Sequence, residues 1–331
     1  MKLSSYLLGS AAALFVASAA NAADLPGEAA PAAVDYVKVC DTFGAGFFYI
    51  PGTETCLDVS GRVRFTVSAS DADLDTGVTG DQNYKFSADA RVDFDARTAT
   101  EYGQLRSFFR IKTTDAAGTA IDKAFIQLGY LTVGYAANFL DSFGGLYGDK
   151  DRNYGGSTNL QVSVLADNLG GGFYAGLQVR DSASTLAKAF GDDVSPVVEG
   201  IVGLTGQAWG SAAVAAAYNS DEESLVVKGA VTAKLAEGFE TTASATYVDS
   251  VSSSADGTYL GLGVSYAATS AATVYANGRY QLADVGEDSW GVTGGIDYTV
   301  VAGLVATAEV TYDDDGTDGT TAGLLRLTRS W

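Results

Sequence analysis

The chain has 331 residues, of which 40 are Asp or Glu and 20 are Lys or Arg, so its formal net charge is -20 at pH 7. A chain this acidic lacks the basic surface that phosphate binding needs, which excludes nucleic acid as a partner. It contains no histidine, and this excludes Ser-His hydrolase triads and imidazole-ligated zinc sites.

The first 22 residues have the pattern of a secretory signal. Lys2 supplies a positive charge, residues 3–20 are apolar and rich in alanine, and Ala20-Asn21-Ala22 matches the small-residue cleavage pattern. We therefore expect export and cleavage after Ala22; a membrane anchor helix is disfavoured because the apolar run is short and interrupted by serines. No later run reaches the ~18 apolar residues that a spanning helix needs, so a mature chain that crosses a membrane does so with strands.

Two cysteines, Cys40 and Cys56, lie close together after this signal. In an oxidising compartment we expect such a pair to form a disulfide that closes a short loop, rather than to serve as a reactive or redox centre. Residues 23–56 are accordingly expected to form a periplasmic segment that leads into the main domain, residues 57–331.

From residue 57 onward the chain alternates between apolar and polar residues in short segments. In residues 84–97, for example, Tyr84, Phe86 and Val92 share one face, while Asp89 and Arg91 share the other. A soluble sheet with one hydrated face also alternates in this way. Segments of about ten residues, however, fit a tilted strand that crosses a bilayer better than the ~5–6 residues of typical soluble strands.

The alternation predicts about sixteen strands, an even number as bacterial transmembrane barrels require. Their expected ranges are 57–69, 82–97, 101–114, 121–129, 131–137, 159–168, 172–181, 197–208, 211–219, 224–236, 238–248, 257–268, 271–283, 289–299, 302–313 and 320–331. The predicted fold class is therefore all-β, a transmembrane antiparallel barrel.

The predicted connections alternate between tight turns and long loops. Tight turns are expected near 98–100, 169–171, 209–210, 236–238, 268–270 and 300–301, and longer polar loops at 70–81, 138–158, 181–196, 249–256, 284–288 and 313–319. Outer-membrane barrels have short periplasmic turns and long external loops, so both termini are expected on the periplasmic side. Acidic residues concentrate in the long loops, as solvated tips or as ligands for divalent cations that bridge lipopolysaccharide.

Three stretches resemble one family. Residues 37–61, VKVCDTFGAGFFYIPGTETCLDVSG, are similar to the segment that opens the first strand of alphaproteobacterial general porins of the rhizobial and Brucella type. AFIQLGYLTVGY at 124–135 resembles a hairpin of that family, and the terminal LLRLTRSW resembles its closing strand. The resemblance covers both ends and the first five strands, whereas residues 181–318 match in pattern and composition.

The resemblance implies a homotrimer of sixteen-stranded barrels in the outer membrane, each with its third external loop folded into the lumen. In this chain that loop is 138–158, and its acids Asp141, Asp149 and Asp151 suit packing against a basic wall. Lys150 and Arg152 are interleaved with these acids, so the sequence leaves open which charges face the pore.

Five arginines on the polar face of the first three strands are the candidates for that wall. We name as the basic wall Arg62, Arg64, Arg91, Arg106 and Arg110. A field between guanidinium groups and loop carboxylates sets ion preference and orients dipolar solutes. The alternative is that these arginines pair with Asp89, Asp93 or Asp95 across strands and hold the barrel rigid.

These observations predict a porin for passive diffusion of small hydrophilic solutes and ions, with no enzymatic activity and no cofactor or metal. Two alternatives remain: a plugged structural or adhesive barrel, and a substrate-specific channel with saturable transport. Tyr174 and Tyr275 are candidate aromatic residues for a specific channel, but two positions do not make a continuous path for a sugar. Expected partners are outer-membrane lipids, lipopolysaccharide and the permeating solutes.

Overall fold

The computed structural model describes residues 38–70, 84–148, 156–182, 196–250 and 256–331. The expected signal, residues 1–22, lies outside the described residues, as do Asp149 and Asp151 of the expected constriction loop. The described part contains no helix with the length and hydrophobicity of a membrane span.

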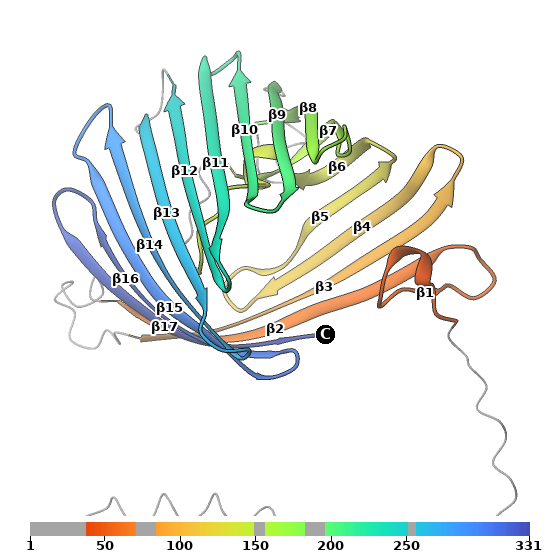
Figure 1. The fold of residues 1–331 in the computed structure, drawn as a ribbon, viewed down its shortest axis with the longest axis horizontal. Helices are drawn as coiled ribbons and strands as arrows, with labels where there is room; N and C mark the ends of the chain where they lie inside the picture. The colour runs from red at the N-terminus through yellow and green to blue at the C-terminus, as the bar shows by residue number, and fades with distance from the viewer. Residues whose placement is uncertain (1–37, 71–83, 149–155, 183–195, 251–255) are drawn as a thin grey trace, which may run out of the picture. The chain divides into compact units, whose positions relative to one another are not determined.

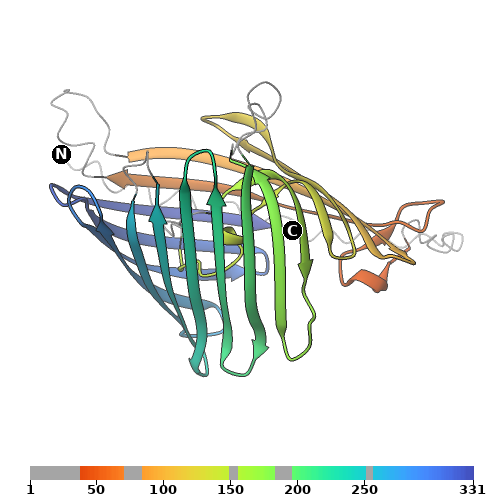
Figure 2. The same cartoon turned by 90° about the horizontal axis from the view of Figure 1, so that it is seen from above.

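The strands form one antiparallel sheet in which each strand pairs with the next, and β17 pairs with β2 (Figures 1 and 2). The sixteen strands from β2 to β17 therefore close into a barrel, which confirms the predicted fold class. They are β2 Cys56–Ser70, β3 Tyr84–Thr100, β4 Gly103–Thr114, β5 Gly118–Leu128, β6 Leu131–Ala137, β7 Thr158–Ala166, β8 Phe173–Asp181, β9 Pro196–Gln207, β10 Gly210–Asn219, β11 Ser224–Ala236, β12 Phe239–Asp249, β13 Gly257–Ala267, β14 Ala272–Ala283, β15 Ser289–Val301, β16 Leu304–Asp314 and β17 Gly319–Ser330.

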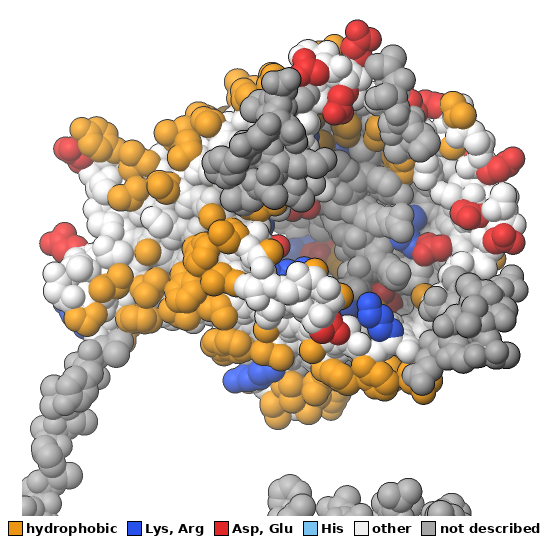
Figure 3. Space-filling model, turned by 180° about the vertical axis from the view of Figure 1, so that it is seen from behind, with side chains coloured by type: hydrophobic (Ala, Val, Ile, Leu, Met, Phe, Trp, Pro, Cys, Tyr) orange, Lys and Arg blue, Asp and Glu red, His pale blue; other side chains and the backbone are white. Residues whose placement is uncertain are grey.

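Burial is reversed with respect to a soluble protein. Leu177 is 70% exposed and Phe86 is 57% exposed, while Glu199 is 0% exposed and Lys228 is 1% exposed. Charged side chains gather in the hollow of the barrel and hydrophobic ones cover much of its outside (Figure 3). An apolar exterior over a polar interior is the arrangement of a barrel that lies in lipid.

The alternation of the strands places seven aromatic residues on the apolar faces that are expected to point outward, and six of these are exposed. Those with exposed side chains are Phe65, Tyr84, Phe86, Phe94, Tyr266 and Tyr298. Tyr312 is half-buried, because its ring lies over Gly319 and packs against Trp290 with the ring centroids 5.2 Å apart.

The two ends of the barrel carry different connections. At one end the turns are short, as at 101–102, 129–130 and 208–209, whereas the other end carries 71–83, 138–157 and 182–195. Two predicted turns are wrong. Residues 98–100 continue β3, where they pair with 103–105 of β4, and the chain turns at 101–102 because Gly103 accepts a φ of 104°. Residues 300–301 continue β15, where Val301 pairs with Leu304, and the chain turns at 302–303 because Gly303 accepts a φ of 76°.

A short strand that the sequence pattern missed covers an open edge. β17 ends beside Arg62, so the first residues of β2 have no strand on that side. Strand β1, Phe48–Tyr49, pairs there with Leu57 and Cys56. The predicted disulfide between Cys40 and Cys56 is present and, with Phe47, forms a small buried cluster that fixes this hairpin. Pairing of an exposed edge prevents association with other strands.

Candidate functional site

The basic wall lies on the polar face of three adjacent strands. Arg62 and Arg64 are on β2, Arg91 is on β3, and Arg106 and Arg110 are on β4. Period-two alternation places them together, because strands that pair in register keep residues of one parity on the same face.

Cross-strand register brings like charges together in this wall. Arg62 lies directly opposite Arg91. Arg97, which the sequence analysis did not assign to the wall, lies opposite Arg106. Directly opposed like charges destabilise a sheet, so this wall requires carboxylates between them.

Three carboxylates supply that compensation, each shared by two arginines. Asp89 pairs with Arg64 at 2.7 Å and with Arg62 at 3.7 Å. Asp93 pairs with Arg110 at 2.7 Å and with Arg91 at 3.7 Å. Asp95 pairs with Arg97 at 2.7 Å and with Arg106 at 2.8 Å. The cross-strand pairs considered from the sequence are thus present. Arg110 also lies 3.6 Å from Asp122, so six guanidinium groups share four carboxylates.

Two aromatic rings lie between the guanidinium groups on the same face. Phe108 and Phe125 stack with centroids 5.2 Å apart. The guanidinium carbon of Arg106 lies 5.1 Å from the Phe108 centroid, and that of Arg110 lies 5.4 Å from it. Cation–π contacts of this kind fix the orientation of arginines without neutralising them.

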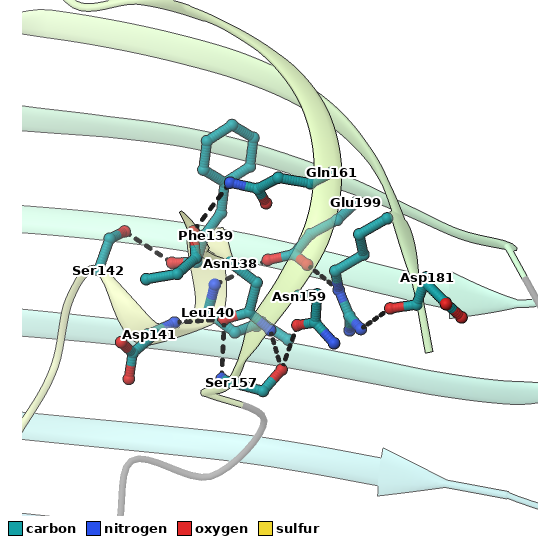
Figure 4. A network of polar contacts seen from close by, with 12 residues as sticks. Asn138, Phe139, Leu140, Asp141, Ser142, Ser157, Asn159, Gln161, Asp181 and Glu199 are labelled. Carbon is teal, nitrogen blue, oxygen red and sulfur yellow. Dashed lines mark hydrogen bonds and ion pairs between the residues drawn. The ribbon is translucent and has the colours of Figure 1, made fainter. Parts of the chain in front are cut away.

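The segment 138–148, which follows β6, begins with a capped turn of 3-10 helix, Phe139–Asp141. The Asn138 side-chain oxygen accepts hydrogen bonds from the backbone N–H of Asp141 at 3.0 Å and of Ser157 at 3.2 Å (Figure 4). Ser157 in turn donates to Asn159 at 2.5 Å. Asn138 and Asn159 are both buried, so this network ties the two ends of the connection together.

Two buried charged residues hold the turn against the polar face of β9 and β11. Glu199 accepts a hydrogen bond from the Leu140 N–H at 2.7 Å and one from Arg180 at 2.9 Å. The Lys228 ammonium donates to the carbonyls of Leu140 at 2.9 Å and Phe143 at 2.6 Å. Buried ionic groups are tolerated only when hydrogen-bonded in this way, so the turn and these side chains depend on each other.

An apolar contact supports the same turn. Phe139 and Leu140 are buried against Val197 and Ile201 of β9, together with small residues of β10. This patch lies inside the barrel, on a face that is otherwise polar, because the turn covers it.

Further along, the segment contacts β12, β13 and β14. Tyr147 donates its backbone N–H to Asn277 at 3.2 Å, and its carbonyl accepts a hydrogen bond from the same side chain. Burial raises the pKa of the Tyr147 hydroxyl, which donates to Glu240 at 3.1 Å. A Cβ on Gly263 would lie 2.9 Å from the Tyr147 ring, so glycine provides the space for this ring.

The sequence of this barrel matches those of known proteins. Residues 24–327 match the model of the porin subfamily. The chain belongs to the porin subfamily. It is 32% identical, over the full length of both proteins, to porin Omp2b of Brucella canis. This porin is also 36% identical to putative outer membrane protein y4fJ of Sinorhizobium fredii, over 61% of each chain.

Solved structures share the fold of this porin. The outer membrane channel DcaP of Acinetobacter baumannii has a TM-score of 0.68 at 16% identity, covering 86% of this chain and 99% of DcaP. A mutant of Rh. blastica porin has a TM-score of 0.59, also at 16% identity, and the match covers 83% of this chain and 100% of that porin. At these identities the likeness concerns the barrel itself.

Sequence patterns predicted the basic wall of this porin better than the residues that contact the segment 138–148. Its five arginines lie together, and Asp141 lies in the turn 139–141, while Asp149 and Asp151 lie outside the described residues. Sequence patterns missed Arg97, Glu199, Lys228 and Asn277. A charged residue in an alternating strand is a weak signal, because most such residues simply face the aqueous interior.

Proposed function

We propose that this porin forms a water-filled channel in the outer membrane through which small hydrophilic solutes and ions diffuse passively. The observation that carries the proposal is the closed barrel with exposed apolar side chains outside and paired charges inside. A channel function, rather than enzymatic activity, agrees with membership of the porin subfamily.

We propose further that the connection 138–157 narrows the channel as a constriction loop. Lys228 holds its first turn on β11, and β11 lies eight strands from β3 around a ring of sixteen. The passage then runs between the loop on one side and the basic wall on the other. Solutes are selected by the width of this passage and by the six guanidinium groups along it.

The assembly is proposed to be a homotrimer embedded in outer-membrane lipid and lipopolysaccharide. Long connections such as 182–195 would face outward from the cell, and the disulfide hairpin would face the periplasm. The name of the Brucella canis relative, a porin, and the barrel fold of an outer membrane channel support an outer-membrane location.

Liposome swelling with neutral sugars of graded size tests the proposal. The refolded full chain is expected to admit sugars at rates that fall steeply with solute radius and rise linearly with concentration. A substrate-specific channel would instead saturate with one sugar. A barrel that inserts into liposomes and admits no sugar would overturn the diffusion pore in favour of a plugged structural barrel.

A further inference from the structure

A cavity of about 820 Å³ lies inside the barrel between residues 141–145 and the polar faces of β7 to β11. Its lining includes Asp167, Thr205 and Ser211, which lie beside the tight turns, so the cavity is on the tight-turn side of the segment 138–148. The volume is within the range of ~300–1,000 Å³ that is typical of small-molecule sites.

Aromatic rings provide flat surfaces in this cavity. Phe143 and Tyr174 line it and pack against one apolar cluster. The Tyr174 ring lies directly over Gly203, where an added Cβ would collide with it, so the ring is held against the barrel wall. The Lys228 ammonium lies 4.9 Å from the centroid of the Phe143 ring, so the Tyr174 ring is the surface suited to packing against the C–H face of a sugar.

Hydroxyl groups surround these rings. The Tyr174 hydroxyl is joined in the lining by those of Ser142, Thr205, Ser211 and Thr232, which come from four different elements. Ser142 already donates to the Phe139 carbonyl at 2.6 Å, and Thr232 shares a hydrogen bond with Thr242 at 3.0 Å. Hydroxyl groups can both donate and accept, as recognition of a polyhydroxylated ring requires, and those of Tyr174, Thr205 and Ser211 are the ones we assign to a solute.

Charge in the cavity has one sign. Two exposed carboxylates, Asp141 and Asp167, belong to the lining, and none of the described residues that line it is basic. The nearby Lys228 ammonium is directed at the carbonyls of Leu140 and Phe143. A solute that carries an ammonium group therefore gains charge-assisted hydrogen bonds here.

We propose that this cavity is a low-affinity binding site for amino sugars, which combine a hydroxylated ring with a cationic amine. The inference rests on the proposed function, because a solute reaches the cavity through an open lumen. The site holds such solutes next to the constriction and raises their local concentration relative to neutral sugars of the same size.

Saturation-transfer NMR on the refolded full chain tests the site at pH 6, where glucosamine is protonated. Glucosamine is expected to bind saturably and about tenfold more tightly than N-acetylglucosamine, since only the former makes a charge-assisted hydrogen bond. The variant Asp167→Asn should remove most of this difference, whereas Glu237→Gln, which changes an exposed turn carboxylate outside the lining, should leave it intact.

A second variant tests the contribution of the aromatic ring separately from that of the carboxylate. Tyr174→Leu is expected to weaken both sugars together, and retained heat-modifiable mobility on gels would confirm that the barrel is folded. Equal binding of the two sugars, or equal losses in Asp167→Asn and Glu237→Gln, would overturn the site. A channel that conducts but shows no saturable binding would overturn this inference and leave the proposed pore intact. A barrel that passes no current would overturn the proposed pore, on which this inference rests.

Discussion

The two halves of the barrel interior treat charge in opposite ways. On β2 to β4 the arginine side chains that pair with Asp89, Asp93 and Asp95 keep between 16% and 29% of their surface exposed. Across the ring, Lys228 and Glu199 are almost fully buried under the segment 138–148. One half presents charge to the lumen, and the other uses charge to hold a loop.

This difference indicates which changes alter permeation and which alter structure. An arginine of the basic wall shares its carboxylate with a second arginine, so loss of one leaves the carboxylate paired. Lys228, by contrast, is the buried donor to two loop carbonyls, and its removal leaves them without that donor.

The largest effect is expected for Lys228→Met. Loss of a buried charged donor costs roughly 3 kcal/mol, enough to increase the population of a detached loop about a hundredfold. Single-channel recordings should show flickering current and closure at lower voltage than in the wild type. Lys234→Met, at an exposed position of the same strand, is the control; equal behaviour of the two variants would contradict the role of Lys228.

Neutralising the opposite half should change selectivity without flicker. Arg62 and Arg91 make the two longest ion pairs, so Arg62→Gln with Arg91→Gln preserves the short pairs of Asp89 and Asp93. The anion-to-cation permeability ratio, measured from the reversal potential, should fall roughly twofold to fivefold because the field along the wall weakens. Lys85→Gln, at the start of β3, is the control; it removes a positive charge that lies outside the basic wall. An unchanged ratio would show that the basic wall does not face the permeation path.

An intermediate effect is expected for a substitution at Gly263, which lies against the Tyr147 ring. A Cβ in Gly263→Ala would lie 2.6 Å from the Asn277 side-chain oxygen and 2.9 Å from the Tyr147 ring, so both must shift and the segment moves away from the wall. Conductance should fall by roughly a fifth to a half, since conductance follows the width of the constriction. Gly278→Ala introduces a Cβ with no atom within 4 Å and should conduct like the wild type. Unaltered conductance in Gly263→Ala would mean that the loop does not limit the current.

The disulfide should matter for the hairpin rather than for the pore. Cysteines separated by 16 residues stabilise the closed loop by roughly 3 kcal/mol. The double variant Cys40→Ser and Cys56→Ser should become sensitive to protease at residues 39–55 while single-channel conductance stays unchanged. A large change in conductance would place the hairpin in the permeation path.

The smallest effect concerns the turn after β16. The Asp315 carboxylate accepts hydrogen bonds from the backbone N–H of Asp318 and from Thr317, and these lower its pKa to about 2. A lowered pKa stabilises the turn above the unfolded value of ~3.9, and this stabilisation is lost as pH falls toward 2. The amide NMR shift of Thr317 should titrate in this window, and Asp315→Asn should abolish the titration. Loss of order already near pH 6 would contradict this assignment.

The sequence predicted the strands because period-two patterning is local and repeats along the whole barrel. Strands β6 and β11 have their predicted bounds. Residues 98–100 were misplaced because threonine and alanine suit a turn or a strand, and pairing with β4 decided between them. The two residues of β1 are too few to show a period, and they pair where β17 ends.

The contacts of the segment 138–148 could not be predicted from local sequence patterns. Leu140 is 59 residues from Glu199 and 88 residues from Lys228 in the sequence. Only closure of the barrel brings these residues together, so their alternation identifies the face on which they lie but not the partner. The basic wall was easier to predict, because its residues lie on three consecutive strands.

Single-channel current through the refolded full chain in a planar bilayer tests the central claim most directly. The account predicts ohmic steps that appear in groups of three, as expected for a trimer of open channels constricted between the basic wall and the loop. Stable insertion of the barrel without any current would contradict it.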